Sequence, residues 1–318
     1  MIATHYQVDG KQLSHQYKEF ISNFRQWNQL HHADHYVLYK ENLGEYISID
    51  ETCLSQGELY TILTNKAAHG KKGTLIAMVK GVKSDEVIKV LTRMPRGKRL
   101  KVKEITLDLS PTMARVARVC FPNARIVNDR FHVQKLMSEA ISDIRVDYRW
   151  QAIDIENQEE ELARETGRKY IPKTFRNGDT RRQLLARSRH IVMKHFSKWT
   201  DSQTIRAEIL FDEYPVLKKV YNISMELTQI YNQRISPALA MTKLARWYEK
   251  VEKLDLKFFR SVIQTMQNNY QTIINYFENR STNASAESFN AKVKAFRSQF
   301  RGVRDIPFFI FRLSKIFA

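Results

Sequence analysis

The chain of 318 residues is 43% hydrophobic and 11% aromatic, which excludes a disordered chain and favours a folded protein of roughly two domains. Its 52 Lys and Arg outnumber its 34 Asp and Glu, so the net charge of +18 points to a polyanionic partner, above all nucleic acid, with a merely basic soluble protein as the alternative. Two cysteines without a CxxC spacing exclude a disulfide framework and a zinc finger, and no apolar run reaches the ~20 residues that span a bilayer.

The N-terminal part is predicted to begin with a helix and to continue with strands. Apolar residues at helical spacing predict a helix over residues 14–30. Three β-rich runs follow, over residues 46–54, 58–66 and 73–81, with short turn-like segments between them. Three consecutive strands with short connections predict an antiparallel meander.

Beyond the meander, helices and strands alternate. Residues 84–94 are predicted to form a helix that has Ser84 as its N-cap and ends before Pro95. Residues 101–109 are typical of a fourth strand, and residues 110–121 of a helix that follows it directly.

Ser110 and Pro111 suit the N-cap and the first position of that helix. A fifth strand over residues 123–129 and a long helix from Arg130 complete the pattern. Few folds have the order β-β-β-α-β-α-β-α, and the RNase H-like mixed sheet with helices on both faces is one of them. We therefore predict an α/β fold of this kind.

The remaining chain is predicted to be mainly helical. Residues 151–275 show almost no strand pattern, and residues 168–198 carry ten cations against one acid, Asp179. We interpret this region as a large all-helical insertion that interrupts the RNase H-like domain. The predicted parts are a helical lead-in (1–45), the first part of the catalytic domain (46–150), the insertion (151–275) and the last part of the catalytic domain (276–318).

Acidic side chains lie at the ends of two predicted strands. Asp50 is near the end of the first strand and Asp108 near the end of the fourth, and in such a sheet these strands are central neighbours. Two close carboxylates repel each other unless a hard cation such as Mg²⁺ joins them. Glu287, on a predicted helix that begins near Ala284, is the candidate third acid because basic residues surround it.

Each acid also has a structural alternative. A single Asp at a strand end is more often a turn residue or a helix cap, and Asp108 could cap the helix that follows it. Glu51 competes with Asp50, which we favour because Glu51 points to the other face of the strand. Asp129 and His132 are candidate accessory residues at the edge of the site, or a helix cap and a polar surface residue.

Basic stretches supply candidate contacts to the DNA backbone. Trp199 is a candidate for stacking on an unpaired base, and packing inside the insertion is the alternative. The candidate DNA-binding residues are Arg96, Lys98, Arg99, Lys101, Arg168, Lys169, Arg176, Arg181, Arg182, Lys292, Lys294 and Arg297.

Three motifs together resemble DDE transposases of bacterial insertion sequences: "ISIDET", "ITLDLSPTMARVARVCFPNARIVNDRFHVQKL" and "NASAESFNAKVKAFRSQFRGVRD". The resemblance is strongest to the ISL-three-like family, especially its ISAon-type members, and runs from about residue 40 to the end of the chain. It places the family's acidic triad on Asp50, Asp108 and Glu287. The family's D-R-F-H element falls on residues 129–132, and its Arg-Leu-Leu element falls in "TRRQLLARSRH".

This resemblance implies a DDE transposase, a polynucleotidyl transferase that uses two Mg²⁺ or Mn²⁺ ions held by the triad. Such an enzyme hydrolyses the phosphodiester at each transposon end and joins the released 3′-hydroxyl to target DNA. The implied partners are double-stranded DNA and a second copy of the chain, in a homodimer or a larger assembly. We expect no membrane partner and a cytoplasmic, nucleoid-associated location.

The sequence departs from the family in one respect. Residues 1–45 are too few for the zinc-binding and helix-turn-helix region that family members usually carry before the first catalytic strand. ISAon-type members encode that region in a separate upstream reading frame, so we expect a separate N-terminal DNA-binding chain as a partner. Two alternatives stay open: a non-catalytic DNA-binding protein derived from a transposase, and an RNase H-like nuclease that cleaves without strand transfer.

Overall fold

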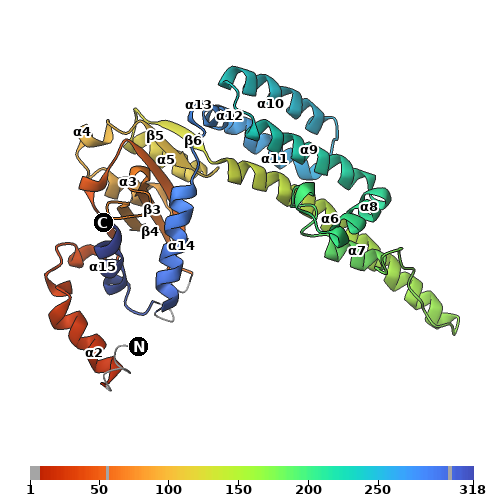
Figure 1. Cartoon of the computed structure of the whole chain (residues 1–318), viewed down its shortest axis with the longest axis horizontal. Helices are drawn as coiled ribbons and strands as arrows, with labels where there is room; N and C mark the ends of the chain where they lie inside the picture. The colour runs from red at the N-terminus through yellow and green to blue at the C-terminus, as the bar shows by residue number, and fades with distance from the viewer. Residues whose placement is uncertain (1–7, 55–56, 300–302) are drawn as a thin grey trace. The chain divides into compact units, whose positions relative to one another are not determined.

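The structure is a computed structural model that describes residues 8–54, 57–299 and 303–318. It separates into two compact units (Figure 1): Met1–Asp129 together with Ser281–Ala318, and Arg130–Arg280. The predicted boundary between residues 150 and 151 falls inside one long helix, α6 (Arg130–Glu165), which belongs to the second unit.

The first unit contains a mixed six-stranded sheet with the order β1-β4-β3-β2-β5-β6. The β1–β4, β2–β3 and β3–β4 pairs are antiparallel, whereas the β2–β5 and β5–β6 pairs are parallel. The α/β class is thus confirmed, as is the adjacency of the strands that carry the two Asp residues. The strand bounds are β1 (Tyr36–Leu38), β2 (Tyr46–Cys53), β3 (Leu59–Asn65), β4 (Leu75–Lys80), β5 (Glu104–Leu107) and β6 (Arg125–Asn128).

The N-terminal part of this unit differs from the prediction. Strand β1 was not predicted, because three residues are too few to show alternation. The predicted end of the first helix, at residue 30, was wrong. The helical segments α2 (Gly10–Gln16) and the π-helical turn η1 (Tyr17–Ile21) stop before Asn23. Asn23 has a φ of 62°, a left-handed conformation with which a right-handed helix cannot continue. The short 3₁₀ turns that follow are η2 (Phe24–Gln26), η3 (Leu30–His32) and η4 (Lys40–Asn42).

Two helix starts test the predicted caps. Ser84 is the first residue of α3 (Ser84–Leu91) and not its N-cap, a position that Lys83 takes without a side-chain hydrogen bond. The Ser110 prediction is confirmed: its hydroxyl accepts the Met113 N–H, and Pro111 opens α5 (Pro111–Cys120). Between α3 and β5 the chain adds one turn that was not predicted, α4 (Arg96–Arg99).

The sheet separates two apolar clusters. Ile49 of β2 joins residues of α3 and α5 in one cluster, whereas Leu54, just after β2, joins residues of α14 (Ala284–Gln299) and α15 (Ile306–Phe317) in the other. The consecutive β3 residues Ile62 and Leu63 belong to different clusters, because successive side chains of a strand point to opposite faces. Helices therefore cover both faces, which we call the α5 face and the α14 face.

The second unit consists mainly of packed helices. Apart from one isolated bridge between Thr174 and Thr180, its described regular elements are helical. Trp247 is fully buried in its core and donates its indole N–H to Ile223 O at 2.8 Å. None of the described helices in either unit is long and apolar enough to cross a membrane. After α6 the helices are α7 (Arg181–Arg187), η6 (Phe196–Lys198), α8 (Asp201–Glu213), α9 (Pro215–Asn232), α10 (Pro237–Glu252), α11 (Lys257–Asn268), α12 (Tyr270–Ile274) and α13 (Tyr276–Asn279).

Candidate active site

Asp50 and Asp108 lie on neighbouring parallel strands of the first unit. Asp50 is inside β2, and Asp108 is the residue directly after β5. The register pairs Ser48 with Thr106, so two residues farther along the strands Asp50 is level with Asp108. Because adjacent strands lie about 4.7–4.9 Å apart, the two backbone positions are immediate neighbours.

The two carboxylates also project from the same face of the sheet. Ile49 and Leu107 belong to the cluster on the α5 face, so the residues that follow each of them alternate to the α14 face. A contact from helix α14 supports this direction: Asn290 Nδ2 donates a hydrogen bond to Asp50 Oδ2 at 2.8 Å. The sequence prediction that these two acids meet at one end of the sheet therefore agrees with the register.

Negative charge accumulates around this pair. Glu51 is half-buried, and its pKa is raised because burial, followed by the carboxylates of Asp108 and Asp50, disfavours its ionised form. Asp50 Oδ1 accepts the Glu51 N–H at 2.8 Å, and Asp108 Oδ1 accepts the Ser110 N–H at 3.0 Å, so Asp108 also has its predicted turn role. Carboxylate oxygens are the ligands that Mg²⁺ prefers, and a cation would relieve the repulsion, so these residues fit the implied metal.

Helix α14 presents Asn290, rather than Glu287, to Asp50. Glu287 is the fourth residue of α14 and is exposed, whereas Asn290, almost one turn later, is 9% exposed and also donates to Glu51 O at 3.3 Å. An acid in the first turn also has a structural reason, because it interacts favourably with the helix dipole. Among the described residues, no three His, Cys, Asp or Glu side chains are grouped as metal ligands. The structure thus brings Asp50 and Asp108 together but does not add Glu287 to them.

Asp129, the residue after β6, forms a hydrogen bond with the segment just before α14. It is 2% exposed, and its Oδ1 accepts the N–H of Asn283 at 3.3 Å. Its own N–H donates to Leu107 O at 2.9 Å, which places it next to the end of β5. His132 is half-buried on α6 of the second unit, and its pairing with Asp129 stays a prediction.

Sequence reasoning missed Lys66, the first residue of the short helix η5 (Lys66–Ala68). Lys66 donates a hydrogen bond to Thr106 Oγ1, and its Nζ lies 3.8 Å from Oε1 of the buried Glu104. Burial lowers the pKa of Lys66, although the carboxylates of Glu104 and Asp129 act in the opposite direction. In the sequence, a lysine after a strand resembles any turn residue. Only the fold places Lys66 beside Thr106 of β5, which stands two residues before Asp108.

Several predicted DNA-binding cations of the first unit are bonded to backbone carbonyls. Arg96, Lys101 and Lys294 are exposed, and their contacts with DNA stay predictions, as do those of the bonded cations. The bonded cations and their distances are Arg99 Nη1 to Cys120 O (2.7 Å), Lys98 Nζ to Lys40 O (3.1 Å), Lys292 Nζ to Gly70 O (2.7 Å) and Arg297 Nη1 to Leu54 O (3.0 Å).

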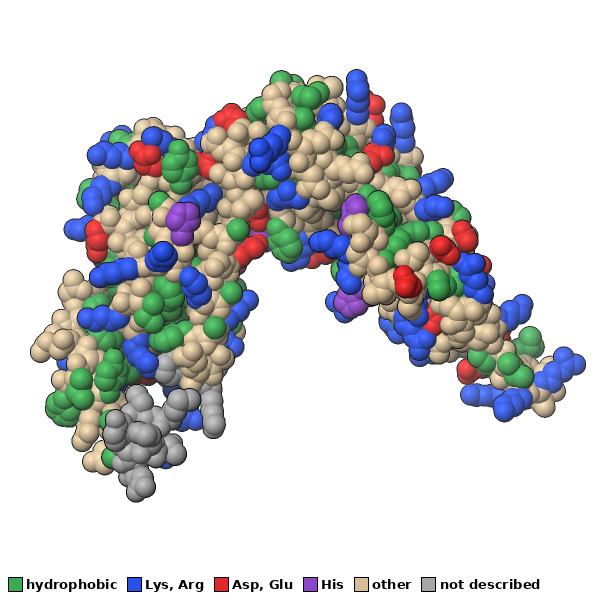
Figure 2. Space-filling model, in the orientation of Figure 1, with side chains coloured by type: hydrophobic (Ala, Val, Ile, Leu, Met, Phe, Trp, Pro, Cys, Tyr) green, Lys and Arg blue, Asp and Glu red, His purple; other side chains and the backbone are tan. Residues whose placement is uncertain are grey.

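One segment of the second unit, residues 168–198, is strongly basic. All ten Lys and Arg between residues 168 and 198 are exposed, and Figure 2 shows Lys and Arg side chains gathered around α7 and toward the far end of α6. Asp179, the one acid of this segment, is fully buried and is paired with Arg187 and Arg206. The exposed surface of the described residues 168–198 therefore carries cations without carboxylates. Its predicted DNA-binding members are Arg168, Lys169, Arg176, Arg181 and Arg182.

Trp199 packs inside the second unit and also lines a cavity. Its ring is half-buried, with ring centroids 5.5 Å from Tyr221 and 6.2 Å from Phe211, and its indole N–H donates to Ile191 O at 3.1 Å. The packing alternative is thus realised. The cavity, of about 400 Å³, leaves base stacking as a prediction.

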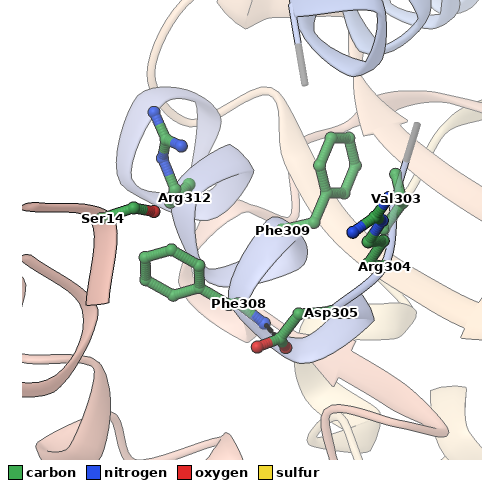
Figure 3. Close-up of a pocket in the computed structure, with 7 residues that line it drawn as sticks. All are labelled: Ser14, Val303, Arg304, Asp305, Phe308, Phe309 and Arg312. Atoms are coloured by element: carbon green, nitrogen blue, oxygen red, sulfur yellow. Dashed lines mark hydrogen bonds between the residues drawn. The ribbon is translucent and has the colours of Figure 1, made fainter. Parts of the chain in front are cut away.

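Another hollow of the first unit lies between α2 and α15 and is about 240 Å³ in volume (Figure 3). Phe308 and Arg312 line it beside Ser14, and Asp305 caps α15 by accepting the Phe308 N–H at 3.1 Å. None of the predicted catalytic residues lines this hollow. We therefore place the candidate active site at the Asp50–Asp108 end of the sheet.

Comparisons with known proteins find similar sequences. The model of a family described as "Transposase", of the DDE and ISL3 type, matches residues 47–313. A transposase for insertion sequence element IS1001 from Bordetella parapertussis is 23% identical over 277 residues, which are 86% of this chain and 61% of that protein. No solved structure matches the chain.

Proposed function

The chain belongs to the ISL3 family of DDE transposases, the family that its motifs resemble, and we propose that it catalyses metal-dependent cleavage of transposon ends and strand transfer into target DNA. One observation carries this proposal: the parallel register of β2 and β5, continued by two residues, brings Asp50 level with Asp108, and Asn290 of α14 donates to Asp50. The surroundings of Glu51 support it: burial first, and then the carboxylates of Asp108 and Asp50, raise its pKa.

The sheet order supports an RNase H-like catalytic domain. Three consecutive antiparallel strands, β2 to β4, extend the sheet on one side of β2, and two parallel strands, β5 and β6, extend it on the other. The second unit, between β6 and α14, would be the predicted helical insertion of such a domain. We propose this arrangement as the scaffold of the active site.

In the proposed mechanism, Asp50 and Asp108 would hold the catalytic Mg²⁺ or Mn²⁺ ions, and Glu287 would complete the set from α14. When bound, such ions lower the pKa of water and stabilise the attacking and leaving oxygens of an in-line displacement. Asn290 bonds Asp50 through its amide, Lys292 bonds α14 to Gly70 in the connection between β3 and β4, and Arg297 bonds it to Leu54 just after β2. These contacts orient the carboxylates before DNA arrives, which lowers the reorganisation needed during the reaction.

The basic residues would bind the DNA backbone. We propose that the exposed cations of residues 168–198 contact phosphates of the transposon end or the target. The chain spans 61% of the length of the IS1001 transposase that it matches. We propose that a further DNA-binding chain takes part in recognition of the end sequence. A homodimer on paired ends is the assembly that we propose.

The test is a strand-transfer assay with DNA that carries the sequences flanking the gene. Wild-type protein with Mg²⁺ should release 3′-hydroxyl ends and join them to target DNA, whereas Asp108→Ala and Glu287→Ala should bind DNA without cutting it. Glu41→Ala, an exposed acid of the same unit, is the matched control and should retain both steps. Cutting without joining would instead favour a nuclease, and binding without cutting by the wild type would favour a non-catalytic DNA-binding protein.

A further inference from the structure

The second unit contains a cavity of about 400 Å³ between α8, the start of α9 and the loop before α7. This volume lies within the range of about 300–1,000 Å³ that is usual for ligand pockets. Its apolar side is formed by the rings of Trp199 and Phe211, and its polar side by Glu208 and Asp212. Arg176 and Lys218 supply cations at the same opening.

The Trp199 ring is held in a fixed orientation. Its indole N–H is bonded to Ile191 O, and Tyr221 packs against it at a ring angle of 32°. The chain around it is also fixed: Trp199 ends the turn η6, and the next residue, Thr200, caps α8 through a capping box with Gln203. A rigid aromatic ring that is half-exposed at a cavity provides a stacking surface at little entropic cost.

The acids of the cavity differ from each other. Glu208 is paired with Arg176 at 2.6 Å, so its charge is already compensated. Asp212, one turn later on the same face of α8, is exposed and forms no ion pair or hydrogen bond with the side chains of the described residues. A carboxylate accepts hydrogen bonds from the exocyclic amines of adenine, cytosine or guanine, which thymine lacks.

The surroundings favour a nucleic-acid ligand over a free small molecule. The segment of residues 168–198, which supplies Arg176 and leads into Trp199, carries ten exposed cations and no exposed acid. A base stacked inside a duplex could not reach such a cavity, whereas an unpaired or extruded base could. We propose that the cavity binds one unpaired base of the DNA substrate, stacked on Trp199, with Asp212 accepting its exocyclic amine. This proposal rests on the proposed function.

The test compares two DNA duplexes of equal length, one fully paired and one with a single unpaired 2-aminopurine. The full-length protein should bind the second more tightly and should change its 2-aminopurine fluorescence. Trp199→Ala should reduce this preference by about 5- to 150-fold, the range expected for one stacked base. Trp199→Phe, which keeps a ring, should restore part of it, and Asp212→Asn should weaken binding of an unpaired adenine more than that of an unpaired thymine.

Trp150→Ala is the matched control, since Trp150 is in the same unit, is 62% exposed and does not line the cavity. The proposal would be overturned if Trp150→Ala lost the preference for the unpaired base as much as Trp199→Ala, or if Trp199→Ala kept that preference. It would also be overturned if free adenosine bound as tightly as the duplex with the unpaired base. If wild-type protein binds both duplexes equally and in a salt-dependent manner, the pocket proposal fails while the DNA-binding function stands. If it binds neither duplex, the proposed function itself fails.

Discussion

The two units of the protein present their functional side chains in different ways. In the first unit, two acids and an amide that are far apart in the chain meet at one sheet end: Asp50 and Asn290 are separated by 240 residues. In the second unit, ten exposed cations lie within the single segment of residues 168–198, and the fold only has to bury the one acid among them. The comparison indicates that the acidic pair of the first unit depends on the register between β2 and β5. The basic surface of residues 168–198 depends only on which of its side chains are exposed.

The largest effect is expected from the first unit. Asp50→Ala should reduce strand cleavage on the order of 10³-fold or more, because it removes one of the two adjacent carboxylates. Binding of duplex DNA should change little, since this side chain carries the wrong sign for phosphate. Cleavage rates and filter-binding affinities measured on one preparation would separate the two effects, and a parallel loss of affinity would contradict the division between the units.

The second unit should be most sensitive at its buried acid. Asp179→Asn leaves Arg206 paired with no carboxylate in a site where its side chain is only 18% exposed, so we expect a loss of about 3–5 kcal/mol in unfolding free energy. Urea unfolding followed by tryptophan fluorescence would measure it. Asp154→Asn, an exposed acid on α6, should cost much less, and equal losses would show that burial of Asp179 is not decisive.

The same residue predicts a pH dependence. Burial alone would raise the pKa of Asp179, but hydrogen bonds from Arg206 and Arg187 outweigh it and hold the pKa below its ordinary value. Stability from this carboxylate is therefore fully present above the unfolded pKa, near 4, and is lost as pH falls through the folded pKa. The difference in unfolding free energy between wild type and Asp179→Asn should shrink in acid, and a difference that grows there would refute the assignment.

A smaller effect should appear at the contact between α14 and the sheet. Asn290→Ala removes the amide that bonds Asp50 and Glu51 O, with an expected cost of about 1–3 kcal/mol for the unmet buried groups. Thermal unfolding would measure it, with the exposed Lys294→Ala on the same helix as the control. No difference between the two variants would mean that Asn290 is not holding the helix in place.

The smallest effect should come from a single surface cation. Arg181→Ala should make the dependence of DNA affinity on salt shallower by about 0.9 in the slope of log K against log salt, the share of one phosphate contact. Arg246→Ala, an exposed cation on α10 outside the basic segment, should leave the slope unchanged. A changed slope in Arg246→Ala alone would move the DNA-binding surface away from residues 168–198.

Much of the first unit could be predicted from sequence because local signals agreed with one another. Alternating apolar residues identified five strands, and Ser110 followed by Pro111 marked a helix start. The predictions failed where the signal was too short or was overridden, as at β1 and at Asn23, whose left-handed backbone ends the first helical segment. At the candidate site the pair of aspartates was predictable, but the roles of Asn290 and Lys66 were not.

By itself, the sequence determined the net charge, the acids in or directly after two strands and the family motifs, because each of these is a property of composition or of neighbouring residues. Only the tertiary structure decided that Asp50 comes level with Asp108 and that Asn290, rather than Glu287, is the α14 residue that donates to Asp50. It also decided which cations are bonded to carbonyls of distant segments, as Lys292 is to Gly70. The physical reason is that register and burial arise from contacts between segments far apart in the chain, which periodicity and local propensity do not encode.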